Sequence, residues 1–185
     1  MTPEVLKDAE HRMAKAVEAA QHDFSTIRTG RANPVILEGI QVDYYGSKLP
    51  INQLAGISAP EPRLLVVTPW DKGAITAIEK AITNSDAGLT PQSDGNVIRL
   101  QVPYLTEERR KDLIKVLHKK TEDHKVAVRN VRRDANERLK DLEKKHEISE
   151  DESKRAQDQI QKLTDKYIEQ IDELAEAKEA ELMEV

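Results

Sequence analysis

Residues 106–146 read TEERRKDLIKVLHKKTEDHKVAVRNVRRDANERLKDLEKKH, and neither glycine nor proline interrupts them. Thr106 is suited to cap a helix, and the carboxylates of Glu107 and Glu108 follow where the helix dipole is positive. Apolar or neutral residues then recur at spacings of three and four: Leu113, Leu117, Thr121, His124, Val128, Val131, Ala135, Leu139 and Leu142. The pattern predicts one helix of roughly 60 Å with a stripe on which other helices pack.

A second face of this predicted helix is strongly cationic. At 100° per residue, four cations fall within about a third of the circumference: Lys125, Arg129, Arg132 and Arg133. No acidic residue lies between positions 125 and 133 to neutralise them, and the arginine fork suits bidentate contacts with phosphate. No aromatic residues are interleaved, which favours structured RNA over stacking on single-stranded bases. The competing interpretation is a solvated face with salt bridges, aided by Asp134 and Glu137.

Composition limits the class of protein. The 185 residues suffice for one elongated domain or two small ones. Charged residues make up 34% and aromatic residues only 3%, which favours helices packed through modest side chains over a large globular core. With no cysteine, disulfides and thiolate chemistry are excluded. The N-terminus lacks an apolar segment and no run is long enough to cross a bilayer, so we expect a cytoplasmic protein without membrane contact.

The formal net charge of −5 hides an uneven distribution. Residues 106–146 contain fourteen Lys or Arg and nine Asp or Glu, a local charge of +5. Residues 149–185 contain five and twelve, a local charge of −7. A mildly acidic chain can therefore still bind a polyanion through one helix, because binding depends on the local charge of that helix rather than on the net charge of the chain.

Two further helices, each with a single apolar stripe, are predicted near the ends of the chain. The first opens at residues 2–4 with Thr2 as its cap, ends near residues 29–30, and has the stripe Leu6, Met13, Val17, Ala20, Phe24 and Ile27. The last begins at a capping box, residues 149–152, and has the stripe Ile160, Leu163, Tyr167, Ile171, Leu174 and Leu182. A helix with one apolar stripe is not stable alone, so the three predict a bundle.

Between the first two helices, the pattern changes to that of a small α/β unit. Residues 40–45 alternate apolar and polar and lead through Gly46-Ser47 into residues 48–51; a glycine at the first central position favours a type II′ hairpin. We expect further strands at residues 57–59, at 64–67 with both faces buried, and at 97–102, and a helix at 74–85 with a stripe of Ile75, Ile78 and Ile82.

Together these patterns predict an α+β fold. An elongated antiparallel three-helix bundle, residues 1–30 and 105–185, carries an inserted β-rich α/β head at residues 31–104. Two connectors join them, and two parallel tethers permit bending while limiting the swing of the head. The predicted hinge residues are Gly30, Arg31, Ala32, Asn33, Pro34, Val102, Pro103, Tyr104 and Leu105.

Catalytic and metal-binding patterns are sparse. The five histidines are scattered without metal-ligand spacing, and we interpret His124, which lies on the apolar stripe, as a packing or polar core residue. No nucleophile elbow or glycine-rich phosphate loop is present. An enzymatic alternative would need a site in the head, around Asp71 or Asp86, where no motif supports it. We therefore expect no enzymatic activity, metal or cofactor.

Several longer motifs resemble those of one known family, the bacterial ribosome recycling factors. The matching runs are IRTGRANP (27–34), YYG (44–46), LTEERRKDL (105–113), VAVRNVRRDAN (126–136), EISED (147–151) and KEAELM (178–183). They stay in register along the whole chain, and the motif in the long helix is highly specific. One departure is Tyr104, where many members have a second proline after Pro103.

The resemblance implies an L-shaped molecule of about tRNA size that acts on the bacterial ribosome after termination. With elongation factor G and GTP, the family splits this ribosome into subunits, releasing mRNA and tRNA, and initiation factor 3 then keeps the subunits apart. The translocase hydrolyses the GTP, so no catalytic residue is implied. The family's bundle binds large-subunit rRNA near the peptidyl-tRNA site through arginines that match Arg110, Arg129 and Arg132. Further expected contacts are Arg28, Arg31 and Arg133.

Two alternatives without recycling activity remain open from the sequence. A coiled-coil adaptor would pair its stripe with another protein, although three complementary stripes in one chain can be buried internally, so we expect a monomer. A general RNA chaperone would bind many RNAs with little preference.

Overall fold

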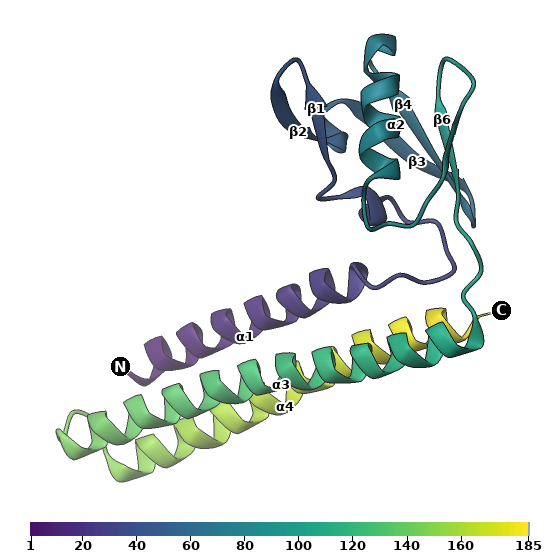
Figure 1. Cartoon of the computed structure of the whole chain (residues 1–185). Coiled ribbons are helices and arrows are strands. Elements are labelled where there is room, and N and C mark those ends of the chain that lie inside the picture. The colour runs from purple at the N-terminus through teal and green to yellow at the C-terminus, as the bar shows by residue number, and fades with distance from the viewer. Residues whose placement is uncertain (185) are drawn as a thin grey trace. The chain divides into compact units, whose positions relative to one another are not determined.

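The structure, a computed structural model, describes residues 1–184 and divides into two compact units (Figure 1). The bundle unit comprises Met1–Ile27 and Lys111–Met183, and the head unit comprises Arg28–Arg110 with Glu184. Long helices in one unit and a small antiparallel sheet in the other confirm the predicted α+β fold class.

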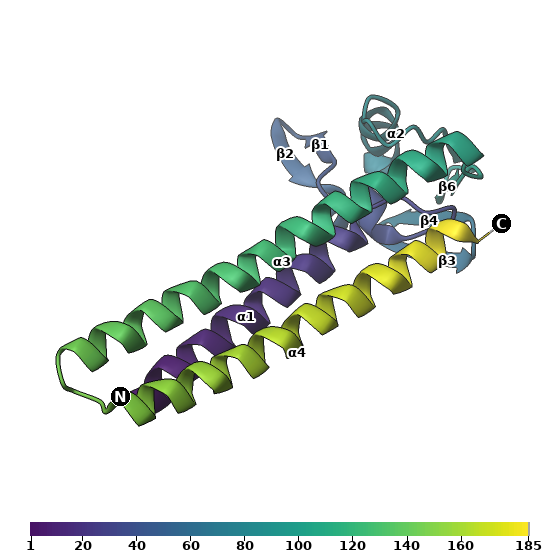
Figure 2. The same ribbon diagram turned by 90° about the horizontal axis from the view of Figure 1, so that it is seen from below.

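Three helices form the bundle unit: α1 Thr2–Ser25, α3 Glu107–Lys144, whose first turn belongs to the head unit, and α4 Glu150–Met183. They lie side by side along their lengths (Figure 2). The backbones of α1 and α4 approach each other most closely, which is consistent with small buried residues such as Ala9 and Ala156 on the two helices. The 38 residues of α3 correspond to roughly 57 Å. The predicted long helix is thus confirmed without interruption.

Local hydrogen bonds determine where α3 begins and where it ends. At its start, the side-chain oxygen of Thr106 accepts a hydrogen bond from the backbone N–H of Arg109 at 3.1 Å, as predicted. At its end, the N–H of Glu147 donates to the carbonyl of Leu142 and the N–H of His146 donates to that of Glu143, each at 3.0 Å. These two bonds form a Schellman motif, in which His146 takes a left-handed backbone with φ of 58°.

The predicted stripes form the core of the bundle unit. Of the nine stripe residues expected on α3, only His124 and Leu142 are half-buried, and the other seven are buried. On α1 and α4 the large stripe residues are buried or half-buried, and small residues not included in the prediction are buried among them: Ala9, Ser153, Ala156, Thr164 and Ala175. Close packing of helices favours such small side chains.

Two predictions about the ends of α1 were wrong. Thr2 is the first helical residue rather than the cap, which is Met1 and makes no side-chain bond. The helix also ends at Ser25, about four residues before the predicted stop at 29–30. The hydroxyl of Ser25 donates to the carbonyl of His22 and that of Thr26 donates to the carbonyl of Asp23, so local side chains satisfy the last turn. At the start of α4, Ser149 caps Glu152 N–H at 3.0 Å, as predicted.

The head unit contains an antiparallel four-stranded sheet in the order β3-β4-β6-β5 and a separate hairpin, β1–β2 (Figure 1). The bounds are β1 Gln41–Tyr44, β2 Ser47–Pro50, β3 Ala55–Glu61, β4 Leu64–Pro69, α2 Ile75–Thr83, β5 Pro91–Ser93 and β6 Ile98–Gln101. Short 3-10 turns lie at Pro34–Leu37, Ile51–Gln53 and Lys72–Ala74. The predicted isoleucines of α2 are buried in one core with residues from both sheets, including Val42, Leu65 and Leu100.

Three details of the head differ from the prediction. The hairpin loop is Tyr45-Gly46, with φ of 51° and 79°, and two positive φ angles define a type I′ turn rather than type II′. Strand β4 alternates buried residues with half-buried or exposed ones, because only one face of it lies against the core. Strand β5, with only one partly buried residue among its three, was not predicted.

No helix among residues 1–184 combines the length and apolarity needed to span a membrane.

Candidate RNA-binding face

The cationic face of α3 is partly neutralised from outside the predicted cluster. Lys125 is largely covered and its Nζ lies 2.6 Å from a carboxylate oxygen of Asp172 on α4. Arg129 lies 2.8 Å from the carboxylate of Glu122, and this hydrogen bond lowers the pKa of Glu122. No acid lies between positions 125 and 133, as the sequence shows, but Lys125 and Arg129 are neutralised from outside that range. Their partners lie two turns earlier on α3 or on another helix.

Arg132 and Arg133 are the cations of this face that stay available. Arg132 makes one long hydrogen bond to Gln161, at 3.4 Å, and Arg133 is exposed and pairs with no acid among residues 1–184. Asp134, expected to neutralise the face, pairs with Arg12 of α1 at 3.0 Å instead. Two neighbouring guanidinium groups with free donors are suited to bind phosphate oxygens.

The other three predicted RNA contacts belong to the head unit. Arg110 is half-buried, and its Nε is enclosed without a hydrogen-bond partner. Arg31 forms a two-bond ion pair with the carboxylate of Glu184. Arg28 and Arg109 line a hollow of about 280 Å³ whose lining includes no acidic residue. Burial, and then the charge of Arg109, lower the pKa of Arg28.

Arg109 is thus a candidate anion contact that sequence reasoning missed. It follows the cap Thr106 by three residues, and its backbone N–H is the one capped. The signal in the sequence was the pair Arg109-Arg110 near a helix N-terminus, where backbone N–H groups and the helix dipole favour anions.

The two predicted hinge connectors are fixed to neighbouring residues of the head. The N–H of Ala32 donates to the carbonyl of Pro62 at 2.6 Å. Val102 and Arg63 are joined by two bonds: Val102 N–H to the Arg63 carbonyl at 2.8 Å, and the Arg63 guanidinium to the Val102 carbonyl at 2.7 Å. Both connectors are therefore attached to the turn between β3 and β4.

The remaining hinge residues differ in how firmly they are held. The side chain of Asn33 accepts a bond from Val35 N–H at 3.1 Å, and Pro34 begins the following 3-10 turn. The Arg63 guanidinium stacks on Tyr104, 3.0 Å from the ring centroid, so this departure from the family pattern carries its own contact. Around Gly30, by contrast, a Cβ would meet nothing within 4 Å. Gly30 is thus a connector position at which a larger side chain can be introduced without a clash.

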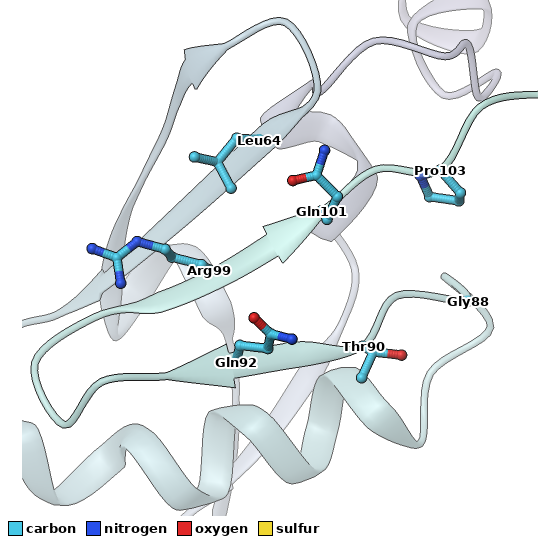
Figure 3. Close-up of a pocket in the computed structure, with 7 residues that line it drawn as sticks. All are labelled: Leu64, Gly88, Thr90, Gln92, Arg99, Gln101 and Pro103. Atoms are coloured by element: carbon cyan, nitrogen blue, oxygen red, sulfur yellow. The ribbon is translucent and has the colours of Figure 1, made fainter.

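The head also contains a shallow hollow of about 440 Å³ (Figure 3). Its lining residues are Leu64, Gly88, Thr90, Gln92, Arg99, Gln101 and Pro103. Gln92 and Gln101 come from neighbouring strands, β5 and β6, and Arg99 is bound by Asp94 at 2.9 Å. These groups can form hydrogen bonds but include no pair of a nucleophile and a base.

The titratable residues considered as alternatives have structural partners. Asp71 accepts bonds from the Tyr44 hydroxyl at 2.6 Å and from the N–H of Gly73 at 2.9 Å. His124 lies 2.7 Å from the carboxylate of Asp23, which confirms its prediction as a polar core contact. Residues 1–184 contain no group of three or more His, Cys, Asp or Glu side chains placed to hold a metal ion.

The fold belongs to a class of helical bundle with an inserted β-rich head, and comparisons identify the family. The sequence model of the family "Ribosome recycling factor" matches residues 20–183. The chain is 59% identical to the ribosome-recycling factor of Carboxydothermus hydrogenoformans over 100% of both chains. It is 65% identical to that of Natranaerobius thermophilus over 96% of this chain and 97% of the relative. The chain belongs to the ribosome recycling factor family, so the resemblance seen in the motifs is confirmed.

Two solved structures extend the similarity to three dimensions. A solution structure of a ribosome recycling factor has a TM-score of 0.77 and 50% identity, covering 100% of this chain and 98% of that one. The T. thermophilus factor has a TM-score of 0.69 and 46% identity, covering 100% of both chains. The latter structure describes that factor and E. coli elongation factor G bound to the E. coli post-termination complex.

Proposed function

We propose that this chain disassembles the bacterial post-termination ribosome into subunits, releasing mRNA and tRNA, together with elongation factor G and GTP. Family membership supports the proposal, as does the T. thermophilus relative described with elongation factor G on that complex. The observation in this chain that carries it is the pair Arg132 and Arg133, which present unoccupied guanidinium donors on the long helix α3.

The bundle binds large-subunit rRNA near the peptidyl-tRNA site, with Arg129, Arg132 and Arg133 on α3. Arg129 can bind RNA together with Arg132 and Arg133, because both side chains of its ion pair with Glu122 are exposed. Exposed ion pairs contribute only ~0.2–1 kcal/mol to stability. An RNA phosphate can replace Glu122 at little cost. Arg110, Arg28 and Arg31 of the head unit supply further contacts. Of these, Arg31 must release the Glu184 carboxylate to bind phosphate.

The bundle acts as a stiff rod that transmits force. Its central helix runs for 38 residues without glycine or proline, and its buried stripe is packed against two partner helices. Arginine–phosphate contacts hold the rod on the ribosome, and elongation factor G moves the head, which turns about the two connectors. The rod carries this displacement into the contacts between the ribosomal subunits.

The chemistry of this cycle belongs to the elongation factor, which hydrolyses GTP. The chain itself works as a monomer in the cytoplasm, without a cofactor, and initiation factor 3 acts on the separated subunits afterwards. Its own contributions are binding, stiffness and the freedom of the connectors.

The test is a splitting assay with defined post-termination complexes. Adding the purified chain, elongation factor G and GTP is expected to lower light scattering as free subunits form. Omitting the factor or GTP should leave the complexes intact. Absence of free subunits in the complete mixture contradicts the proposal. A stable dimer in analytical ultracentrifugation, combined with that absence, supports the coiled-coil adaptor instead.

A further inference from the structure

Tyr45 occupies a position that folding alone does not explain. It is the first central residue of the type I′ turn between β1 and β2, with φ of 51°, and 87% of the residue is exposed. Such turns favour Asn, Asp or Gly, because a left-handed backbone costs a residue with a Cβ roughly 1–2 kcal/mol. A bulky ring held in solvent on an unfavourable backbone points to a role outside the fold.

Trp70 is the only tryptophan of the chain and is also exposed, at 71%. Its backbone is fixed, since its N–H donates to the carbonyl of Leu54 at 3.2 Å. The ring is therefore displayed from an ordered position at the end of β4 rather than from a loose loop.

Tyr44 and Asp71 link the turn to the residue that follows Trp70, and we call these four residues the aromatic patch: Tyr44, Tyr45, Trp70 and Asp71. The rings of Tyr44 and Tyr45 meet edge to face with centroids 4.5 Å apart, and the Tyr44 hydroxyl donates to Asp71, next to Trp70, at 2.6 Å. The hydrogen bond to the Asp71 carboxylate raises the pKa of Tyr44 to about 12. The Tyr44 and Tyr45 rings and the backbone of Trp70 are thus held before any partner arrives, which limits the entropy lost on binding.

The other exposed aromatic residue of the head unit has an internal contact. Tyr104 is 71% exposed, but one face of its ring carries the Arg63 guanidinium. Tyr104 also belongs to the connector predicted as a hinge, so its exposure has an explanation within the chain.

The charges around the aromatic patch favour a protein partner over RNA. Asp43 and Lys48 balance each other in residues 40–50, Asp71 and Lys72 do so in residues 69–73, and no arginine lies in 32–62 or 64–98. Stacking on RNA bases is normally combined with a basic track for the backbone. Exposed Tyr and Trp with balanced charge match the centre of a protein interface, where these residues dominate binding energy.

We propose that the aromatic patch is the docking surface of the head for elongation factor G, whose surface must offer an apolar cleft for the two rings. The inference rests on the proposed function, in which that factor moves the head. It assigns the contact to Tyr45 and Trp70, on the β1–β2 turn and at the end of β4.

Three variants separate docking from folding. Tyr45→Asn replaces the ring by a residue that the turn prefers, so thermal stability should stay equal or rise while docking weakens. Trp70→Ala removes the second ring from a largely exposed site. Val116→Ala, at an exposed apolar residue of α3 in the bundle unit, is the control. We expect Tyr45→Asn and Trp70→Ala to raise by about tenfold the elongation factor concentration that gives half-maximal splitting. Affinity for ribosomes without the factor should be unchanged, and the control should behave as wild type.

A second measurement reads the contact without splitting. With 5-fluorotryptophan at position 70, the single ¹⁹F resonance should shift and broaden when elongation factor G with a non-hydrolysable GTP analogue is added. The response should be lost in Tyr45→Asn. If wild type fails to split ribosomes but the resonance responds, the proposed function fails and the docking surface stands. An unchanged resonance together with equal splitting by wild type and variants overturns the docking surface alone. The docking surface is also overturned if the variants bind ribosomes more weakly in the absence of elongation factor G. That result would mean that the patch contacts the ribosome itself.

Discussion

Nε2 of His124 on α3 lies 2.7 Å from a carboxylate oxygen of Asp23 on α1. The other oxygen of Asp23 lies 2.6 Å from Nζ of Lys120, one turn earlier on α3. The His124 ring also packs edge-on against Phe24. These polar contacts lie beside the apolar stripe and fix which turn of α1 faces which turn of α3.

Asp23→Ala is therefore expected to destabilise the chain by about 1–3 kcal/mol, because it leaves Lys120 and His124 without their carboxylate partner. Urea unfolding followed by circular dichroism measures the difference. Asp8→Ala is the matched control. Asp8 also joins α1 to α3, through Arg138 at 3.1 Å, but both side chains of this pair are about half exposed, so the loss of stability should be small. Equal losses for the two variants would contradict the role given to Asp23.

The same site makes stability depend on pH. Burial tends to raise the pKa of Asp23, but hydrogen bonds from Lys120 and His124 outweigh it and lower the pKa below the ordinary 3.8. A lowered pKa in the folded state means that the contribution is complete above about pH 4 and is lost as the pH falls through the folded value. The stability gap between wild type and Asp23→Ala should thus narrow as the pH falls below about 4. A constant gap would show that the carboxylate charge is not responsible.

His146→Gly is expected to stabilise the bundle by about 0.5–1 kcal/mol. His146 holds the left-handed position that ends α3, with φ of 58°, and glycine adopts this backbone without the Cβ penalty. Thermal unfolding measures the gain. His11→Gly, in the interior of α1, should lose about as much, since glycine there disfavours the helix.

Arg133→Ala should weaken ribosome binding by about 1–3 kcal/mol without lowering the melting temperature. Arg132→Ala should act alike, because its bond to Gln161 is long. Loss of one phosphate contact also flattens the dependence of log affinity on log salt by about 0.7–0.9. Arg138→Ala is the control, since Arg138 points away from this face of α3 and pairs with Asp8. Equal weakening of ribosome binding in all three variants would show that this face of α3 does not contact the RNA.

Gly30→Val tests the hinge. A Cβ at Gly30 would meet no atom within 4 Å and its φ is not positive, so folding should be preserved while the branched side chain restricts the connector. We expect ribosome affinity within about twofold of wild type and slower splitting. Gly56→Val, at another open glycine of the head, is the control. Ala32 is less suitable, because it packs against the core of the head. Parallel loss of binding and splitting would argue against a hinge.

The long-range order of the fold was readable from the sequence because it depends on periodic apolar residues. The stripe of α3 and the isoleucines of α2 repeat at helical spacing, and both were placed correctly. The errors arose where the local structure depends on a few side-chain or backbone atoms. Tyr45 was not expected at a left-handed position, since a tyrosine there gives no local signal, and the turn was shifted by one residue. The early end of α1 depends on the hydroxyls of Ser25 and Thr26.

The candidate site was only half predictable for a similar reason. Positions on one helix face follow from the sequence, because α3 is one continuous helix. Neutralisation of the α3 cations depends on which residues of other turns and helices come near, and Asp172 is 47 positions from Lys125 in the chain. Sequence spacing does not report such contacts. The stacking of Arg63 on Tyr104 is a further example.

The placement of α1 before the head and of α4 after it has a consequence for biosynthesis. Helix α1 ends at Ser25, and α4, the helix whose backbone comes nearest to it, begins only at Glu150. At ~5–20 residues per second, the ribosome needs roughly 6–25 s to make the intervening chain. During that interval Met13 and Phe24, buried in the finished protein, have no α4 to cover them. A nascent chain of this family should therefore recruit chaperones until its last helix emerges.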